Sequence, residues 1–216
     1  MQIIRRDDFL KPRDSWLDVL VLDHLSVPLT RLCARVGLTP TSVSVISIGW
    51  RLLAIAAFAD DRLWVGAAAY IVGLLLDGVD GKLARLTRRT SSLGAALDYS
   101  ADMGLFAALA LSLGVSVGSP LWLIGACIAL GVASALAPSP VVEAASAISA
   151  DSGSWNRRTA SHRLRSIPGV LEVHFVMFGL SPLLGGGAVT ATLAAASLYF
   201  LATWIGKLAI VGRVEA

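Results

Sequence analysis

The stretch DGVDGKLARLTRRTSSLGAALDYSAD, residues 77–102, decides how this chain is built, because it sets four carboxylates into an otherwise apolar sequence. They belong to Asp77, Asp80, Asp98 and Asp102. Hydrophobic residues make up 56% of the 216 residues and charged residues only 15%, which is far more apolar than a soluble domain. The sequence therefore predicts an integral membrane protein in which the four acidic side chains form a functional site.

Around this stretch, six apolar runs are long enough to cross a bilayer as helices, which takes about 20 residues each. Prolines and glycines separate the runs. An open sheet edge cannot satisfy its hydrogen bonds in lipid, so the predicted fold is all-α, with six transmembrane helices. The predicted spans are residues 42–59, 64–85, 92–117, 121–148, 169–186 and 188–210.

Basic residues are distributed unevenly about these spans. Of the 18 Lys and Arg residues, sixteen precede the first span, cluster around the second-to-third or fourth-to-fifth connection, or lie at the C-terminal end of the sequence. The exceptions are Arg62, on the opposite side, and Arg51, within the first span, which either snorkels or faces the acidic residues. Cytoplasmic loops carry the excess of Lys and Arg, so both termini and the acidic site are predicted on the cytoplasmic side of the cytoplasmic membrane.

The segment ahead of the first span mixes apolar and polar residues. Residues 1–41 are predicted as a cytoplasmic leader with a juxtamembrane amphipathic helix, and residues 42–216 as the six-helix catalytic domain. Apolar residues recur there at three- and four-residue steps, which is typical of a helix on the membrane surface, with a bend at Pro28. A solvent-exposed leader is the alternative. The recurring residues are Leu17, Leu20, Val21, Leu25, Leu29 and Leu32.

Helical spacing brings the four aspartates together. Asp77 and Asp80 are three residues apart, and Asp98 and Asp102 four, so each pair shares one helix face. If the second and third spans are antiparallel and turn near residue 89, the two pairs of aspartates lie at the same depth in the membrane. At about 1.5 Å per residue, they lie roughly 13 to 18 Å from the turn. All four carboxylates are predicted to converge near the cytoplasmic rim.

Four converging carboxylates repel one another and lose hydration. Two Mg²⁺ or Mn²⁺ ions would balance their charge, accept oxygen ligands and leave positions for phosphate oxygens. The alternative is packing by salt bridges to Lys82, Arg85 and Arg51, but three cations leave four buried anions unbalanced. A site for two divalent ions is therefore the favoured interpretation.

The residues between the aspartates complete a longer pattern. The spacing of Asp77, Asp80-Gly81, Ala84-Arg85, Gly94, Asp98 and Asp102 resembles the signature of the CDP-alcohol phosphotransferase (CDP-alcohol phosphatidyltransferase) family without a gap or substitution. The segment LTPTSVS, residues 38–44, is similar to the family's Thr-Pro-Asn segment, with Thr41 in place of the usual Asn.

This resemblance implies an enzyme that transfers a substituted phosphate group from a CDP-alcohol to the hydroxyl of a second alcohol and releases CMP, in phospholipid or phosphodiester synthesis. It assigns Asp77, Asp80 and Asp98 to metal binding. It assigns Asp102 both to metal binding and to the role of general base. The positions that it implies for substrate binding are Gly81, Ala84, Arg85, Ser91, Gly94 and Pro40.

The donor is less closely specified. CDP-diacylglycerol is favoured, as the commonest donor in the family. A water-soluble CDP-polyol with a polar or inositol-type acceptor is the alternative, because KPRDSW, residues 11–16, is similar to the leader of members acting on polar alcohols. Met103 stands where the branch of the family that uses glycerophosphate usually has Lys, which argues against a glycerophosphate acceptor. A small cation transporter is a remote alternative that leaves the glycine and arginine spacing unexplained.

For the acceptor, Arg163 and Arg165 in the fourth-to-fifth connection are candidates to bind an anionic alcohol. Alternatively, they only orient the chain or touch anionic lipid headgroups. Glu172 and His174, which begin the fifth span, either contact the acceptor or pack at the interface. Membrane lipid is the expected surrounding and nucleic acid is not an expected partner, while the resemblance implies a homodimer.

Overall fold

The computed structural model describes residues 15–87, 92–136 and 170–214, and within these ranges the chain is helical with no strand. The all-α class is thereby confirmed. A short π-helical turn η2 (Asp18–Leu22) leads into α1 (Asp23–Arg35). The bundle helices are α2 (Pro40–Ala59), α3 (Leu63–Thr87), α4 (Ser92–Ser116), α5 (Leu121–Leu136), the continuous segments α7 (Val170–His174), η4 (Phe175–Leu180) and α8 (Ser181–Leu184), and α9 (Gly186–Val214).

The helices coincide with the predicted apolar runs. Three of them, α2, α3 and the Gly186–Leu208 part of α9, are long and apolar enough to span a membrane. Shorter apolar helices occupy the other runs, at Ala101–Ser116, Leu121–Leu136 and Val170–Leu184. The count of six crossings stays a prediction, as does helix beyond Leu136, because residues 137–169 lie outside the described ranges.

Local signals explain where α2 begins and ends. Thr39 has extended backbone angles, and its side-chain oxygen accepts a hydrogen bond from the backbone N–H of Ser42 at 3.2 Å. Pro40 follows as the first helical residue, where its missing N–H has no partner to lose. The turn into α3 passes through Asp61, whose positive φ of 57° reverses the chain.

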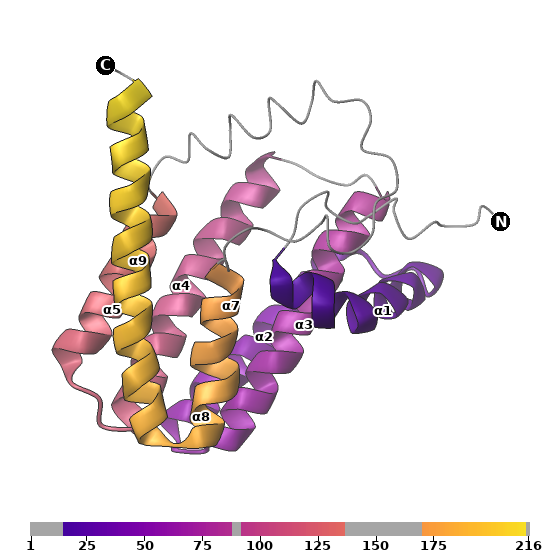
Figure 1. The fold of residues 1–216 in the computed structure, drawn as a ribbon. Coiled ribbons are helices and arrows are strands. Elements are labelled where there is room, and N and C mark those ends of the chain that lie inside the picture. Colours follow the sequence, from indigo (N-terminus) through magenta and orange to yellow (C-terminus); the bar gives the residue numbers. More distant parts are fainter. Residues whose placement is uncertain (1–14, 88–91, 137–169, 215–216) are drawn as a thin grey trace.

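The bundle has α4 in the middle, with α2 and α3 on one side and α5 and α9 on the other (Figure 1). The segments α7, η4 and α8 pack against α3, α4 and α9. Aromatic side chains fill the centre, with Phe58, Phe178 and Phe200 almost wholly buried. At Gly131 of α5 an added Cβ would meet the Phe106 ring at 2.6 Å, so this glycine lets the helices approach closely.

The helix α1 runs across the bundle direction and packs on α3 (Figure 1). Its buried face is largely polar, with Asp23, Ser26 and Thr30 fully enclosed. Of the apolar residues predicted to face a membrane, Leu17 is buried instead and Leu29 is half-buried. The exposed ones are Leu20, Val21, Leu25 and Leu32. Docking of this face on a membrane stays a prediction.

Candidate active site

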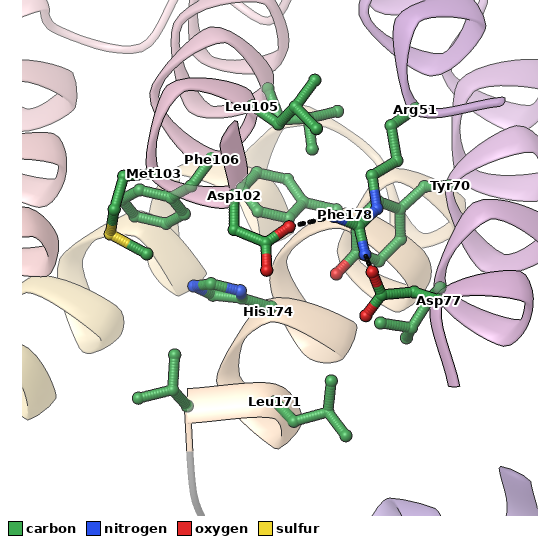
Figure 2. A pocket seen from close by; sticks show the side chains of 13 residues that line it. Arg51, Tyr70, Asp77, Asp102, Met103, Leu105, Phe106, Leu171, His174 and Phe178 are labelled. Carbon is green, nitrogen blue, oxygen red and sulfur yellow. Dashed lines mark hydrogen bonds and ion pairs between the residues drawn. The ribbon is translucent and has the colours of Figure 1, made fainter. Parts of the chain in front are cut away.

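An arginine joins the two helices that carry the acidic residues. The guanidinium of Arg51, on α2, binds the carboxylate of Asp77 on α3 at 2.8 Å and that of Asp102 on α4 at 2.5 Å (Figure 2). Asp77 and Asp102 therefore face each other across one positive charge. Of the two alternatives that the sequence left open for Arg51, the structure shows the one in which it faces the acidic site.

The α2–α3 contact is shaped to admit this arginine. Ser47 and Arg51 lie one turn apart on α2, opposite Gly73 and Asp77 on α3. The Ser47 hydroxyl donates a hydrogen bond to the Gly73 carbonyl at 2.9 Å, which holds the two helices together. A Cβ at Gly73 would lie 2.9 Å from Cγ of Arg51. The glycine therefore leaves the space through which the arginine side chain reaches the carboxylates.

The remaining predicted metal ligands are only partly located. Asp80 lies one turn beyond Asp77 on α3 and is buried. Asp98 belongs to α4, but its side chain lies outside the described residues. Among the side chains that are described, no three His, Cys, Asp or Glu residues are grouped closely enough to hold a metal ion. The structure thus brings Asp77 and Asp102 together and leaves the full set of four a prediction.

The carboxylates of Asp77 and Asp102 are chemically suited to bind a cation. Their side chains are 33% and 39% exposed, whereas the Arg51 side chain between them is only 9% exposed. Carboxylate oxygens are the ligands that Mg²⁺ and Mn²⁺ prefer in proteins. A positive charge already lies between them, in the form of the guanidinium.

A cavity of about 200 Å³ opens beside this cluster (Figure 2). Its polar wall consists of Arg51, Tyr70, Asp77, Asp102 and His174, and the rest is formed by Leu, Val, Met and Phe side chains of α3, α4, α7 and η4. The cavity is therefore amphipathic. Such a space suits a molecule with a polar group at the carboxylates and an apolar body.

Glu172 and His174, for which the sequence offered the same two alternatives, have different surroundings. The Glu172 carboxylate accepts hydrogen bonds from the backbone N–H groups of Trp16 at 2.5 Å and Leu17 at 3.2 Å, which ties α7 to the residues just before η2. His174 lines the cavity, with its ring stacked on Phe106 at a centroid distance of 4.7 Å. Glu172 therefore serves packing, whereas His174 borders the site.

Lys82 has a partner that sequence reasoning missed. Its ammonium pairs with Asp23 of α1 at 3.1 Å, and the two side chains are 3% and 0% exposed. The alternative in which Lys82 pairs with the acidic cluster is therefore wrong for this residue. A signal was available, because Lys82 lies two residues after Asp80 and so projects from a different helix face. Tyr70 and Phe106 were also missed, since they read as ordinary core aromatics.

The other predicted substrate positions are spread along the site helices. Arg85 lies one turn after Gly81, and a Cβ on Gly81 would approach its guanidinium to 3.6 Å, so the arginine folds back over the glycine. Ala84 lies next to Arg85 on α3, and Pro40 begins α2. Gly94 lies in α4. Ser91, Arg163 and Arg165 fall outside the described residues.

The chain belongs to the CDP-alcohol phosphatidyltransferase family, which matches residues 37–212. This membership confirms the resemblance drawn from the signature and places the protein among transferases of phosphate-containing groups. The matched range includes the acidic site, the cavity and the described bundle helices, except for the last two residues of α9.

One curated relative is a phosphatidylinositol phosphate synthase of Cutibacterium acnes (strain DSM 16379 / KPA171202). It is 32% identical over 108 residues, which are 48% of this chain and 52% of that protein. The match thus spans about half the length of the relative.

Crystal structures of the Mycobacterium tuberculosis phosphatidylinositol phosphate synthase share the fold at 20% sequence identity. The form with CDP-DAG bound covers 86% of this chain and 92% of its own, with a TM-score of 0.58. The apo form covers 85% and 94%, also with a TM-score of 0.58. The complex with manganese and citrate covers 85% and 87%, with a TM-score of 0.55.

Proposed function

We propose that this protein catalyses the metal-dependent transfer of a substituted phosphate group from a CDP-alcohol to the hydroxyl of a second alcohol, with release of CMP. One observation carries the proposal. Asp77 and Asp102, the first and last aspartates of the family signature, lie on separate helices around one positive charge and border a cavity. A carboxylate cluster beside such a cavity can hold a cation and reach a bound alcohol at the same time.

The roles follow from position and chemistry. Asp77, Asp80 and Asp98 would hold two Mg²⁺ or Mn²⁺ ions together with Asp102, and when bound these ions stabilise the charge on phosphoryl oxygens. Asp102 borders the cavity, so its carboxylate can accept the proton of the acceptor hydroxyl. Arg85 is suited to bind the donor's phosphate by charge-assisted hydrogen bonds.

CDP-diacylglycerol is the proposed donor. The apolar part of the cavity wall suits the glycerol ester end of a lipid, and the Mycobacterium tuberculosis neighbour was crystallised with CDP-DAG bound. A water-soluble CDP-polyol is the second candidate, favoured by the KPRDSW leader. Membership in a family of transferases argues against the cation transporter.

The acceptor is proposed to be a polar, inositol-type or anionic alcohol, bound with the help of Arg163 and Arg165. The name of the Cutibacterium acnes relative supports an inositol phosphate. The site would face the cytoplasm from the cytoplasmic membrane, in a chain that forms a homodimer.

Three single substitutions and a chelator test the proposal. Asp77→Asn, Asp80→Asn and Asp98→Asn should each abolish CMP release from CDP-diacylglycerol, and EDTA should do so reversibly. Mass spectrometry of extracted lipids would identify the product. The control is Asp60→Asn, which alters an exposed carboxylate, 64% accessible, that pairs with Arg62 in the α2–α3 turn. A wild-type enzyme that keeps full activity in EDTA would contradict the metal requirement.

A further inference from the structure

Arg51 is placed where a purely structural arginine would be costly. It lies in the middle of α2, one of the helices apolar enough to span a membrane, and its residue surface is only 7% exposed. A buried charge in such a helix is unfavourable unless it is paired and hydrogen-bonded. Both partners of Arg51, Asp77 and Asp102, are carboxylates that the family signature assigns to metal binding.

Within the described residues, the contacts of Arg51 leave one of its donors unused. Its single guanidinium is shared between the carboxylates of Asp77 and Asp102. The Nε–H of Arg51 is buried and has no hydrogen-bond partner within the described part of the chain. Structural arginines usually satisfy their buried donors. Among the described contacts, Arg51 is therefore held by the two carboxylates alone.

We infer that Arg51 is a positioning residue of the acidic site, an internal cation that holds Asp77 and Asp102 in the metal-free protein and yields these carboxylates to divalent cations. The yielding step rests on the proposed function, whereas the holding step does not. The partial exposure of both carboxylates lets an ion approach them from the cavity while Arg51 remains buried behind them. Gly73 provides the space that keeps the arginine side chain in place.

The holding step is tested by thermal unfolding of purified protein in detergent with EDTA. Arg51→Gln should lower the unfolding midpoint, because two neighbouring carboxylates lose their shared cation. Asp102→Asn should lower the midpoint in the Arg51 protein but raise it in the Arg51→Gln protein, where it removes an uncompensated charge. Arg51→Lys should restore part of the loss. Equal shifts from Asp102→Asn in both backgrounds would overturn the inference.

The yielding step is tested by Mn²⁺ titration followed by electron paramagnetic resonance, which reports binding without turnover. Arg51→Gln should bind Mn²⁺ at least about fivefold more tightly than wild type, because a fixed positive charge beside the ligands opposes an incoming cation. Arg62→Gln, which removes an exposed arginine at the α2–α3 turn, is the matched control and should not change the affinity. If Arg51→Gln does not accumulate, Arg51→Gln/Asp102→Asn compared with Asp102→Asn alone should show the same direction.

The outcomes separate the inference from the proposed function. Wild-type protein that binds Mn²⁺ as tightly as Arg51→Gln, or more tightly, would overturn the yielding step and leave the proposed function standing. Wild-type protein that binds no Mn²⁺ would overturn the yielding step together with the proposed metal requirement. The unfolding cycle in EDTA would still decide whether Arg51 holds the two carboxylates.

Discussion

Two charged clusters each include one residue of α3, Lys82 in the first and Asp77 in the second. The clusters differ in how far their side chains are exposed. Lys82 and Asp23 form a pair of one cation and one anion, with side chains 3% and 0% exposed. Arg51 instead joins two anions, Asp77 and Asp102, that are about a third exposed and border the cavity. The same kinds of charged group are therefore enclosed in one cluster and open to a cavity in the other.

The physical reason lies in what each cluster loses when one member is removed. When one partner of a closed, buried pair is removed, the other charge loses its opposite charge in a dry interior, which is strongly unfavourable. The open cluster keeps contact with the cavity, and we propose that its carboxylates exchange one cation for another. The closed pair is thus suited to fix α1 on α3, and the open cluster to bind ions and substrate.

The largest expected effect is the loss of stability when the buried Lys82–Asp23 pair is broken. Lys82→Met should lower the free energy of unfolding by about 3–5 kcal/mol, the usual result of breaking a buried ion pair from one side. Chemical denaturation in detergent would measure it. Combining Asp23→Leu with Lys82→Met should recover most of the loss, because no charge is then left buried. A single Lys82→Met protein as stable as wild type would erase the distinction between the clusters.

Next in size is the effect of Asp102→Asn on chemistry. Turnover should fall at least about a hundredfold, the scale of positioned proton transfer, with CDP-alcohol binding largely intact. Single-turnover kinetics together with donor titration would separate the two quantities. Any change in stability should be small beside that of Lys82→Met. An equal loss of donor binding would instead make Asp102 a metal ligand only.

Arg85→Ala should have a smaller effect, on donor binding alone. Losing a hydrogen bond to a charged phosphate should weaken donor affinity by about 1.5–3 kcal/mol. Calorimetric titration with the CDP-alcohol measures this directly, and Arg62→Ala is the control at an exposed arginine. Unchanged donor affinity would exclude Arg85 from the donor-binding site.

The smallest expected effect concerns the acceptor. Arg163→Ala or Arg165→Ala should raise the acceptor KM several-fold and leave donor affinity unchanged, because only an anionic acceptor needs their charge. Arg157→Ala, in the same connection but farther from the fifth span, is the control. Saturation curves that do not move in either variant would favour a neutral alcohol as acceptor.

Much of the fold could be predicted from local patterns. The length of each apolar run and the prolines and glycines between runs predicted helices that match α2, α3, α4 and α9 closely, because helix formation in lipid depends on nearby residues. The spacing of the aspartates predicted which helix faces carry them. The signature predicted the family, which is confirmed.

Which neighbour each face meets could not be predicted in the same way. Arg51 had two open alternatives. Lys82 was considered only in the disfavoured alternative, as a partner of the signature aspartates, and Asp23 was not singled out at all. A helical period specifies the direction of a side chain from its own axis but not the residue that packs opposite. The partners of Arg51 depend on how α3 and α4 approach α2, and the partner of Lys82 depends on how α1 approaches α3. These approaches depend on contacts such as Ser47 with Gly73, which are far apart in the chain. Only the packed bundle could show that one buried cation closes a structural pair while the other lies at the edge of a cavity.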